Sequence, residues 1–307
     1  MVKPYFSLDS MVEGSFDVAN KLFGVRFVLR PDIKTYHPDV RVYEVHETVR
    51  QWCLDGGIPC INRNNEDEGI NIIPIVVNNN NFVKSAEGEP TLLSFDNCVT
   101  LFHEFGHACH GILSKVKYNR LSGVAVVADF MELPSQLMEH WVFEPEVLKK
   151  YSRHYDTDET IPQDLLHKLK AAATFGQGFD IIEYMACALI DQKSHQLESI
   201  ERINMPEFEE KVLAELDMPA GIVMRYRILD FIHLFDGPEY VAGYYTYLWA
   251  EVLDADAFDA ILEASSIFGK KTAKRLVKYF YSAGNSIDPM DAYRKFRGRD
   301  PIIESML

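Results

Sequence analysis

Residues 101–110 read LFHEFGHACH and place three of the chain's ten histidines within eight positions. Residues 97–114 show the three- and four-residue apolar spacing of an amphipathic helix. On such a helix His103 and His107 leave the same face one turn apart. Two imidazoles at this spacing can meet one zinc ion at about 2.0–2.1 Å. The stretch therefore predicts a helix that carries two metal ligands.

Glu104 lies at the edge of the same face, where its carboxylate can act as a general base without ligating the metal. The resulting pattern H-E-x-x-H is the signature of zinc peptidases. A structural alternative stays open, because buried histidines that form hydrogen bonds in a helical core would look the same. His110 is seven residues from His103, about 10.5 Å along the axis, so we expect it to pack or to lie behind the ligands. A third ligand is expected from another helix.

A di-iron site in a helical bundle is the competing metal interpretation, because Glu104 and His107 also form an E-x-x-H pair. That architecture uses two such motifs. The other candidates, His167 and His233, are preceded at that spacing by the shorter aspartate. The single copy favours one zinc ion per chain.

The composition is that of a globular protein, with 47% hydrophobic and 25% charged residues among 307. The formal charge of −15 disfavours nucleic-acid and anionic-membrane partners, which it would repel. Five scattered cysteines without a C-x-x-C pair indicate a reducing compartment. The first residues lack the apolar run of a signal peptide, and no apolar stretch approaches the roughly 20 residues that span a bilayer. We expect a cytoplasmic protein without a membrane partner.

The chain divides into a short strand-rich region and a long helical region. Residues 22–29, 41–46 and 72–77 are predicted strands, the last at an edge because of Pro74, and residues 56–69 are a predicted loop. Asp96 is the expected N-cap of the histidine helix. Helical spacing covers 97–114, 132–152, 164–200, 206–216, 240–266 and 270–283. The expectation is one mainly α domain over 1–307, with a small sheet region at about 20–82 and a helical body at about 96–307.

Residues 122–141, SGVAVVADFMELPSQLMEHW, resemble the second signature of the thimet oligopeptidase and peptidyl-dipeptidase family of zinc peptidases. In that family the glutamate of the D-F-x-E-x-P-S-Q element completes the zinc site. The matching residue is Glu132, 25 positions after His107. A carboxylate from a separate segment gives three protein ligands and leaves a fourth position for water. The resemblance thus implies zinc held by His103, His107 and Glu132 in a zincin-like helical domain.

Residues 233–249, HLFDGPEYVAGYYTYLW, are similar to a third family element, a glycine-rich loop followed by tyrosines over the zinc. In the family its histidine and tyrosines bind the substrate and the developing oxyanion. The resemblance implies catalytic roles for His233, Tyr240 and Tyr247. It implies substrate-binding roles for Tyr244, Gly237 and Gly243. If the segment is helical, the three tyrosines share one face.

The C-terminal residues 285–307 also resemble the family, so the similarity covers nearly the whole chain. Residues 139–155 and 161–166 favour the peptidyl-dipeptidase branch, which releases C-terminal dipeptides from short peptides. An endo-oligopeptidase and a catalytically weak peptide-binding fragment are the alternatives. Family members are roughly twice as long, so their N-terminal half is missing and is a possible partner. Residues 47–71 and the pair Gly123-Val124 also depart from the family pattern, which leaves any substrate contact from 47–71 open.

Overall fold

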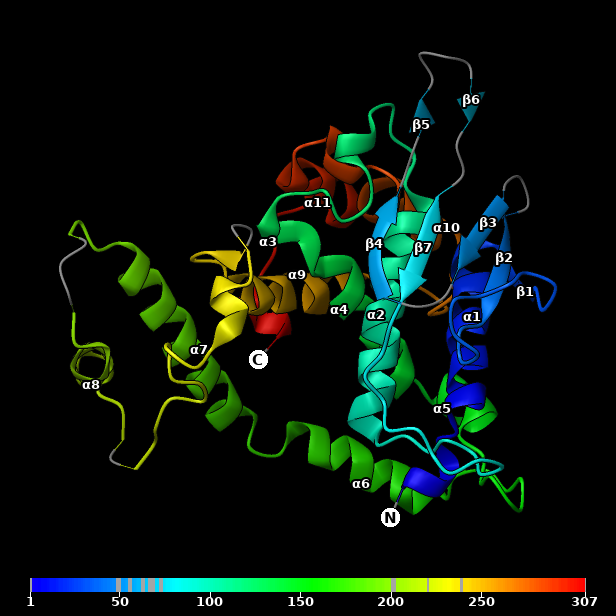
Figure 1. Cartoon of the computed structure of the whole chain (residues 1–307), viewed down its shortest axis with the longest axis horizontal. Helices are drawn as coiled ribbons and strands as arrows, with labels where there is room; N and C mark the ends of the chain where they lie inside the picture. The colour runs from blue at the N-terminus through cyan, green and yellow to red at the C-terminus, as the bar shows by residue number, and fades with distance from the viewer. Residues whose placement is uncertain are drawn as a thin grey trace. The chain divides into compact units, whose positions relative to one another are not determined.

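A computed structural model describes residues 2–306 except 48–50, 55–56, 62–63, 66–69, 72–73, 200–202, 220 and 238–239. The fold is mainly α with small antiparallel sheets in the N-terminal part, as the sequence predicts (Figure 1). The chain divides into two compact units. Unit 1 comprises Met1–Leu166 and Ala250–Leu307, and unit 2 comprises His167–Trp249. A single catalytic domain over 1–307 stays a prediction.

The secondary structure of the described residues begins with a helix and ends with helices. The α-helices are α1 (Leu8–Phe23), α2 (Phe95–Leu113), α3 (Ala128–Met131), α4 (Leu133–Glu139), α5 (Pro145–Tyr151), α6 (Gln163–Thr174), α7 (Gln177–His195), α8 (Met205–Glu215), α9 (Tyr245–Leu262), α10 (Lys270–Leu276) and α11 (Pro289–Arg297). The strands are β1 (Val25–Leu29), β2 (Val42–Glu47), β3 (Gln51–Leu54), β4 (Gly57–Ile61), β5 (Asn64–Asn65), β6 (Ile70–Asn71) and β7 (Ile75–Asn78). None of these described helices is long and apolar enough to cross a membrane.

Several expected helices are present but shorter than their apolar spacing indicates. The range 164–200 divides into α6 and α7 at Gly176, whose φ of 79° leaves the right-handed helical path. The range 132–152 divides into α4, a 3-10 turn (His140–Phe143) and α5, whose first residue is Pro145. The range 270–283 becomes α10 followed by a π-helical turn, Val277–Tyr281. Apolar spacing therefore located these helices but not their ends.

The N-terminal ends of two helices correct the sequence interpretation. The prediction of Asp96 as N-cap of α2 is wrong: Ser94 is the N-cap, its side chain accepts from Asn97 N at 3.1 Å, and Asn97 Oδ1 accepts from Ser94 N. Helix α1 was not predicted at all. Ser7 caps its start and Gly24, at φ 73°, ends it.

The predicted strands form antiparallel pairs in unit 1. β1 pairs with β2, from Val25 opposite Glu47 to Leu29 opposite Tyr43, and β2 pairs with β3. The first strand starts at residue 25 rather than 22, because α1 occupies the chain up to residue 23. The third predicted strand is present as β7, while residues 72–73 of that prediction lie outside the described residues. The loop predicted over 56–69 is wrong where it is described, since β4 pairs with β7 there and β5 pairs with β6.

Aromatic packing joins the first helix and first strand to α2. The rings of Phe16 and Phe27 stack with centroids 4.1 Å apart, and each lies within 5.6 Å of the ring of Phe105. Figure 1 shows α1 beside the β1–β3 sheet and α2 beside the β4–β7 pair. Burial of these rings removes apolar surface from water, which stabilises the folded state by about 25 cal/mol per Å². This packing holds α2 in place from one side.

On its other side α2 packs against α4 at unusually close range. A Cβ on Gly106 would lie 2.6 Å from both Pro134 O and Ser135 Cα, and 3.0 Å from Met138 Cβ. Only glycine allows this approach of two backbones. The buried Tyr281 adds a second contact, because its hydroxyl donates to Pro134 O at 2.8 Å. The start of α4 is therefore fixed by α2 and by the π-helical turn.

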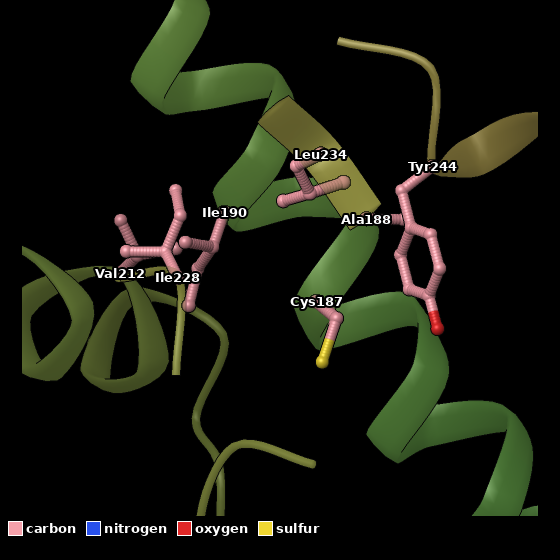
Figure 2. Packing of buried hydrophobic residues seen from close by; sticks show 7 residues of the cluster. All are labelled: Cys187, Ala188, Ile190, Val212, Ile228, Leu234 and Tyr244. Atoms are coloured by element: carbon pink, nitrogen blue, oxygen red, sulfur yellow. The ribbon is translucent and has the colours of Figure 1, made fainter. Parts of the chain in front are cut away.

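Unit 2 has its own small core around α7. Its buried residues come from α7, α8 and the segments that follow them, as Figure 2 shows for Ala188, Val212 and Leu234. The full cluster is Cys187, Ala188, Ile190, Val212, Ile228, Leu234 and Tyr244. A core of this size buries little apolar surface, and small units of this kind are only marginally stable on their own.

We expect Gly106→Ala to lower the free energy of unfolding of unit 1 by about 1–3 kcal/mol, because its methyl group overlaps backbone atoms that cannot turn away. Metal affinity should fall in parallel as α4 moves away. Gly178→Ala in α7 is the matched control, since no described atom lies within 4 Å of its added Cβ. Thermal unfolding and a competitive chelator titration measure both effects. Equal stability and affinity for the Gly106 variant and the control would contradict the close-packing argument.

Candidate metal centre

Helix α2 presents the three motif residues from one part of its surface. His103, Glu104 and His107 are half-buried, while their neighbours Phe102, Phe105 and Gly106 are buried. The buried residues anchor the helix to the β1–β2 sheet and to α4. The two imidazole rings lie 5.0 Å apart and nearly perpendicular, as the four-residue spacing predicts.

Glu132 comes from the junction between α3 and α4. It has helical backbone angles (φ −86°, ψ −13°) and is only 4% exposed. The Ser135 hydroxyl lies 2.9 Å from Glu132 Oε2 and 2.7 Å from Glu132 O. Because Pro134 and Ser135 contact Gly106 of α2, the carboxylate is held over the histidines. The packing of two helices thus brings together residues that are 25 positions apart.

The three side chains meet at one point, with one ligand atom each within 4.8 Å of the others. Glu132 Oε2 lies 3.3 Å from His103 Nε2 and 3.1 Å from His107 Nε2. Donor atoms at the corners of a tetrahedron with 2.0–2.1 Å bonds lie about 3.3 Å apart. The observed distances match that value, so the three residues fit a metal ion with a further coordination position.

A second carboxylate, that of Glu139, orients the first histidine. Glu139 Oε1 lies 2.7 Å from His103 Nδ1, on the opposite side of the ring from Nε2. When Nδ1 donates to this carboxylate, Nε2 keeps its lone pair for a metal. Sequence reasoning missed Glu139. The sequence feature that could have revealed Glu139 is its spacing of seven residues from Glu132, which places the two side chains two turns apart on the same side of α4.

The electrostatics of the pocket favour positive charge. Burial lowers the pKa of His103, but hydrogen bonds to Glu132 and Glu139 outweigh burial and raise that pKa to about 10. Burial raises the pKa of Glu132, yet its hydrogen bonds to His103 and His107 hold it well below the usual value. A metal ion at this place competes with a proton, so metal affinity is expected to rise with pH.

His110 lies apart from the three ligand atoms. It is fully buried, and neither ring nitrogen has a hydrogen-bond partner among the described residues. Burial, with a smaller contribution from His107, lowers its pKa to about 3, so the ring is neutral. Its nearest aromatic contact is an edge-on arrangement with Tyr281 at 6.3 Å. A neutral, enclosed ring is suited to packing behind the ligands.

A group of acids from α9 lies close to α4 in unit 1. His140, next to Glu139, places Nε2 2.7 Å from Asp254 Oδ1 and stacks on Phe258. Burial raises the pKa of Asp254 to about 6, although His140 opposes the shift. Burial, followed by the charges of Asp254 and Glu139, raises the pKa of Glu251 to about 7. Sequence reasoning missed these acids, because helical spacing on α9 gives no sign of a partner on α4.

The predicted residues of unit 2 form a group of their own. His233 lies in the 3-10 turn Ile232–Phe235, its Nε2 lies 3.0 Å from Tyr247 Oη, and its ring lies 4.6 Å from that of Tyr240. Tyr244 is only 6% exposed and belongs to the core of this unit. The three tyrosines do not share a helical face, because α9 begins at Tyr245. Gly237 has a φ of 156°, and Gly243 is the second residue before α9.

The geometry of unit 1 defines a class of protein. An H-E-x-x-H helix whose ligand set is completed by a carboxylate from a second helix is typical of metallopeptidases. The sequence model of peptidase family M3 matches residues 1–307, and the chain belongs to that family. Membership in this family implies a metal, and His103, His107 and Glu132 form a cluster that could hold one. The resemblance seen in the sequence is confirmed.

The curated relatives include two kinds of peptidase. Dipeptidyl carboxypeptidases of Salmonella typhimurium and Escherichia coli are 38% and 39% identical over 322 and 324 residues. Oligopeptidase A of Escherichia coli is 34% identical over 332 residues. Each match covers 100% of this chain but 47% of the relative, so the chain spans about half the length of these relatives.

We expect Glu139→Ala to weaken metal binding by about 10–100-fold, because His103 loses the acceptor that fixes its ring. A competitive chelator titration at constant pH measures the affinity. Glu89→Ala, an exposed glutamate, is the control and should bind metal like the parent chain. If the two variants bound metal equally well, Glu139 would have no part in orienting His103.

Glu251→Gln should remove a pH dependence of stability. The pKa of Glu251 is about 7 in the folded chain and about 4.5 when unfolded, so the folded state binds more protons between these values. The stability gained from its protonated form is present below pH 4.5 and is lost as pH rises through 7. Relative to the parent chain, the variant should gain about 1–2 kcal/mol between pH 5 and pH 8, because solvent screens part of the charge of this partly exposed side chain. Urea unfolding at both pH values measures the gain, and parallel curves for the two proteins would rule out the shift.

Proposed function

We propose that this chain is the catalytic portion of a zinc-dependent peptidase that hydrolyses short peptides. The meeting of His103, His107 and Glu132 at one point, with Glu104 on the same helix, carries the proposal. Two imidazoles and a carboxylate are a donor set of catalytic zinc sites, which keep a position for water. A chain that only binds peptides has no need of Glu104, which favours an enzyme.

The residues of unit 1 have distinct tasks in the proposed reaction. A zinc ion bound there supplies a Lewis acid toward water and the scissile carbonyl. Glu104 accepts a proton from water as the water oxygen attacks the carbonyl carbon, and then donates that proton to the leaving amine. Glu139 keeps the ring of His103 in place, and Ser135 holds the carboxylate of Glu132.

The residues of unit 2 are assigned to the substrate. The hydrogen bond between His233 and Tyr247 supports a joint role in binding the peptide and the oxyanion of the tetrahedral intermediate. Tyr240, whose ring contacts His233, is the second candidate donor. One well-placed donor to an oxyanion is worth about 3–4 kcal/mol. Tyr244, Gly237 and Gly243 are assigned to the loop that shapes the substrate site.

Release of C-terminal dipeptides is the proposed cleavage mode. It is supported by identities of 38% and 39% to relatives named dipeptidyl carboxypeptidase, against 34% to one named oligopeptidase A. An N-terminal half like that of the longer relatives is the proposed partner of this chain, and it would enclose the substrate. A cytoplasmic location is proposed as well, and the buried free thiols of Cys98, Cys109 and Cys187 support a reducing compartment.

Glu104→Gln should bind zinc like the parent chain while turnover falls by about 100-fold or more, because the amide cannot accept the proton. Mass spectrometry of products from N-terminally blocked peptides measures turnover and cleavage position together. A chelator should abolish cleavage, and added zinc should restore it. Glu89→Gln is the matched control.

The products also distinguish the alternatives. Sequential loss of C-terminal dipeptides supports the proposed mode, and internal cuts support an endo-oligopeptidase. If the parent chain bound peptides but showed no zinc-dependent cleavage, the chain would be a peptide-binding fragment and not an enzyme. Full activity of the Glu104 variant would contradict the assignment of Glu104 as the base.

A further inference from the structure

One face of α7 carries three polar side chains that contact a single stretch of backbone in unit 2. Asp191 and Gln192 follow Tyr184 by seven and eight residues, so both lie about two turns further along the same side of the helix. The stretch that they contact is residues 242–244, directly before α9. Nothing in the family match or the metal site assigns these residues a role.

The three contacts hold the backbone N–H and C=O of Tyr244 and the backbone C=O of Ala242. Asp191 Oδ2 accepts a hydrogen bond from Tyr244 N at 3.0 Å, and the Tyr184 hydroxyl donates to Tyr244 O at 2.9 Å. The side-chain amide of Gln192 donates to Ala242 O. The backbone of Tyr244 is therefore held at both its N–H and its C=O group.

The central carboxylate is an unusual group to find in this place. Asp191 is 0% exposed, and burial of a charge is unfavourable unless it is paired and hydrogen-bonded. His195, one turn further along α7, places Nδ1 2.9 Å from Asp191 Oδ1 and 3.0 Å from Asp191 O. An apolar residue could fill the same space but could not accept from Tyr244 N, so the backbone contact is the feature that needs the carboxylate.

The held stretch is also conformationally restricted. Ala242 has a φ of 53°, a left-handed conformation that residues other than glycine adopt only when their surroundings impose it. The Tyr244 ring stacks on the Tyr184 ring with centroids 4.4 Å apart and planes 18° from parallel. These contacts together define one path for the chain into α9.

That path sets the position of the proposed substrate groups. Tyr247 lies three residues after Tyr244, inside the first turn of α9, and Tyr240 lies two residues before Ala242. His233 is supported by the same helix, because its neighbour Leu234 is 2% exposed in the core cluster beside Ala188 of α7 (Figure 2). Both partners of the hydrogen bond between His233 and Tyr247 are thus carried by segments packed on α7.

We propose that Asp191 and Tyr184, assisted by Gln192, are positioning residues that hold Tyr244 and thereby align Tyr247 with His233 for substrate. The proposal rests on the proposed function for the role of that pair in the reaction. Catalytic groups must be held to within a fraction of an ångström, and a displacement of about 1 Å can lower the rate about 100-fold. Three hydrogen bonds to the main chain provide such precision, since they do not depend on the rotamers of the loop's own side chains.

Hydrogen exchange of the full chain tests the contact without relying on activity. In Asp191→Ala, the amide of Tyr244 should exchange at least 10-fold faster, while amides of α8 keep the protection seen in the parent chain. Asp191→Asn should restore most of the protection, because the Asn oxygen can accept from Tyr244 N. Asp180→Asn, an exposed aspartate in the first turn of α7, is the matched control. Unchanged exchange at Tyr244 in Asp191→Ala overturns the proposal, whether or not the chain cleaves peptides.

A double-mutant cycle with Tyr247 tests the functional part. Asp191→Ala should lower kcat for peptide cleavage by about 10-fold or more, and Tyr184→Phe should lower it by a few-fold. In both variants KM should change less than about threefold, and the zinc content should stay the same. The double variant Asp191→Ala/Tyr247→Phe should lose much less kcat than the product of the two single fold-losses. A merely structural role predicts multiplied losses, and that result would overturn the proposal. If the parent chain shows no zinc-dependent cleavage, the proposed function fails, and the exchange experiment still decides whether Asp191 holds Tyr244.

Discussion

The close contact of α2 and α4 at Gly106 is the constraint on which the metal pocket depends. It joins the helix that bears both histidines to the helix whose first turn follows Glu132. Because two backbones touch, the distance between the helices does not vary with side-chain rotamers, and packed interiors transmit any shift directly. Packing therefore sets Glu132 Oε2 3.1–3.3 Å from the Nε2 atoms of the two histidines.

Charge around the pocket is balanced by neighbours rather than by solvent. The nearly buried Glu132 faces two imidazoles, and His103 lies between Glu132 and Glu139. Beyond them, burial raises the pKa values of Asp254 and Glu251, although His140 opposes the shift at Asp254.

The sequence predicted the metal ligands for two different reasons. His103 and His107 follow from helical periodicity, which depends only on local geometry. Glu132 followed from family resemblance, because no spacing rule relates residues on separate helices. Where tertiary contacts decide the local structure, the sequence interpretation was wrong: the helix expected over 240–266 begins only at Tyr245, and Tyr244 is held outside it by Asp191 and Tyr184. Asp96 was wrong as N-cap for a local reason, since Ser94 and Asn97, three residues apart, form a reciprocal pair of hydrogen bonds.

The hydrogen bond from Tyr281 to Pro134 has a consequence for the order of events during synthesis. Unit 1 is discontinuous, and the residue that secures the start of α4 is made long after Glu132. At about 5–20 residues per second, Glu132 leaves the ribosome roughly 7–30 s before Tyr281 does. In that interval unit 2 is synthesised as one continuous stretch with a core of its own. The nascent chain thus presents His103, His107 and Glu132 well before Tyr281, which secures the start of α4, has left the ribosome.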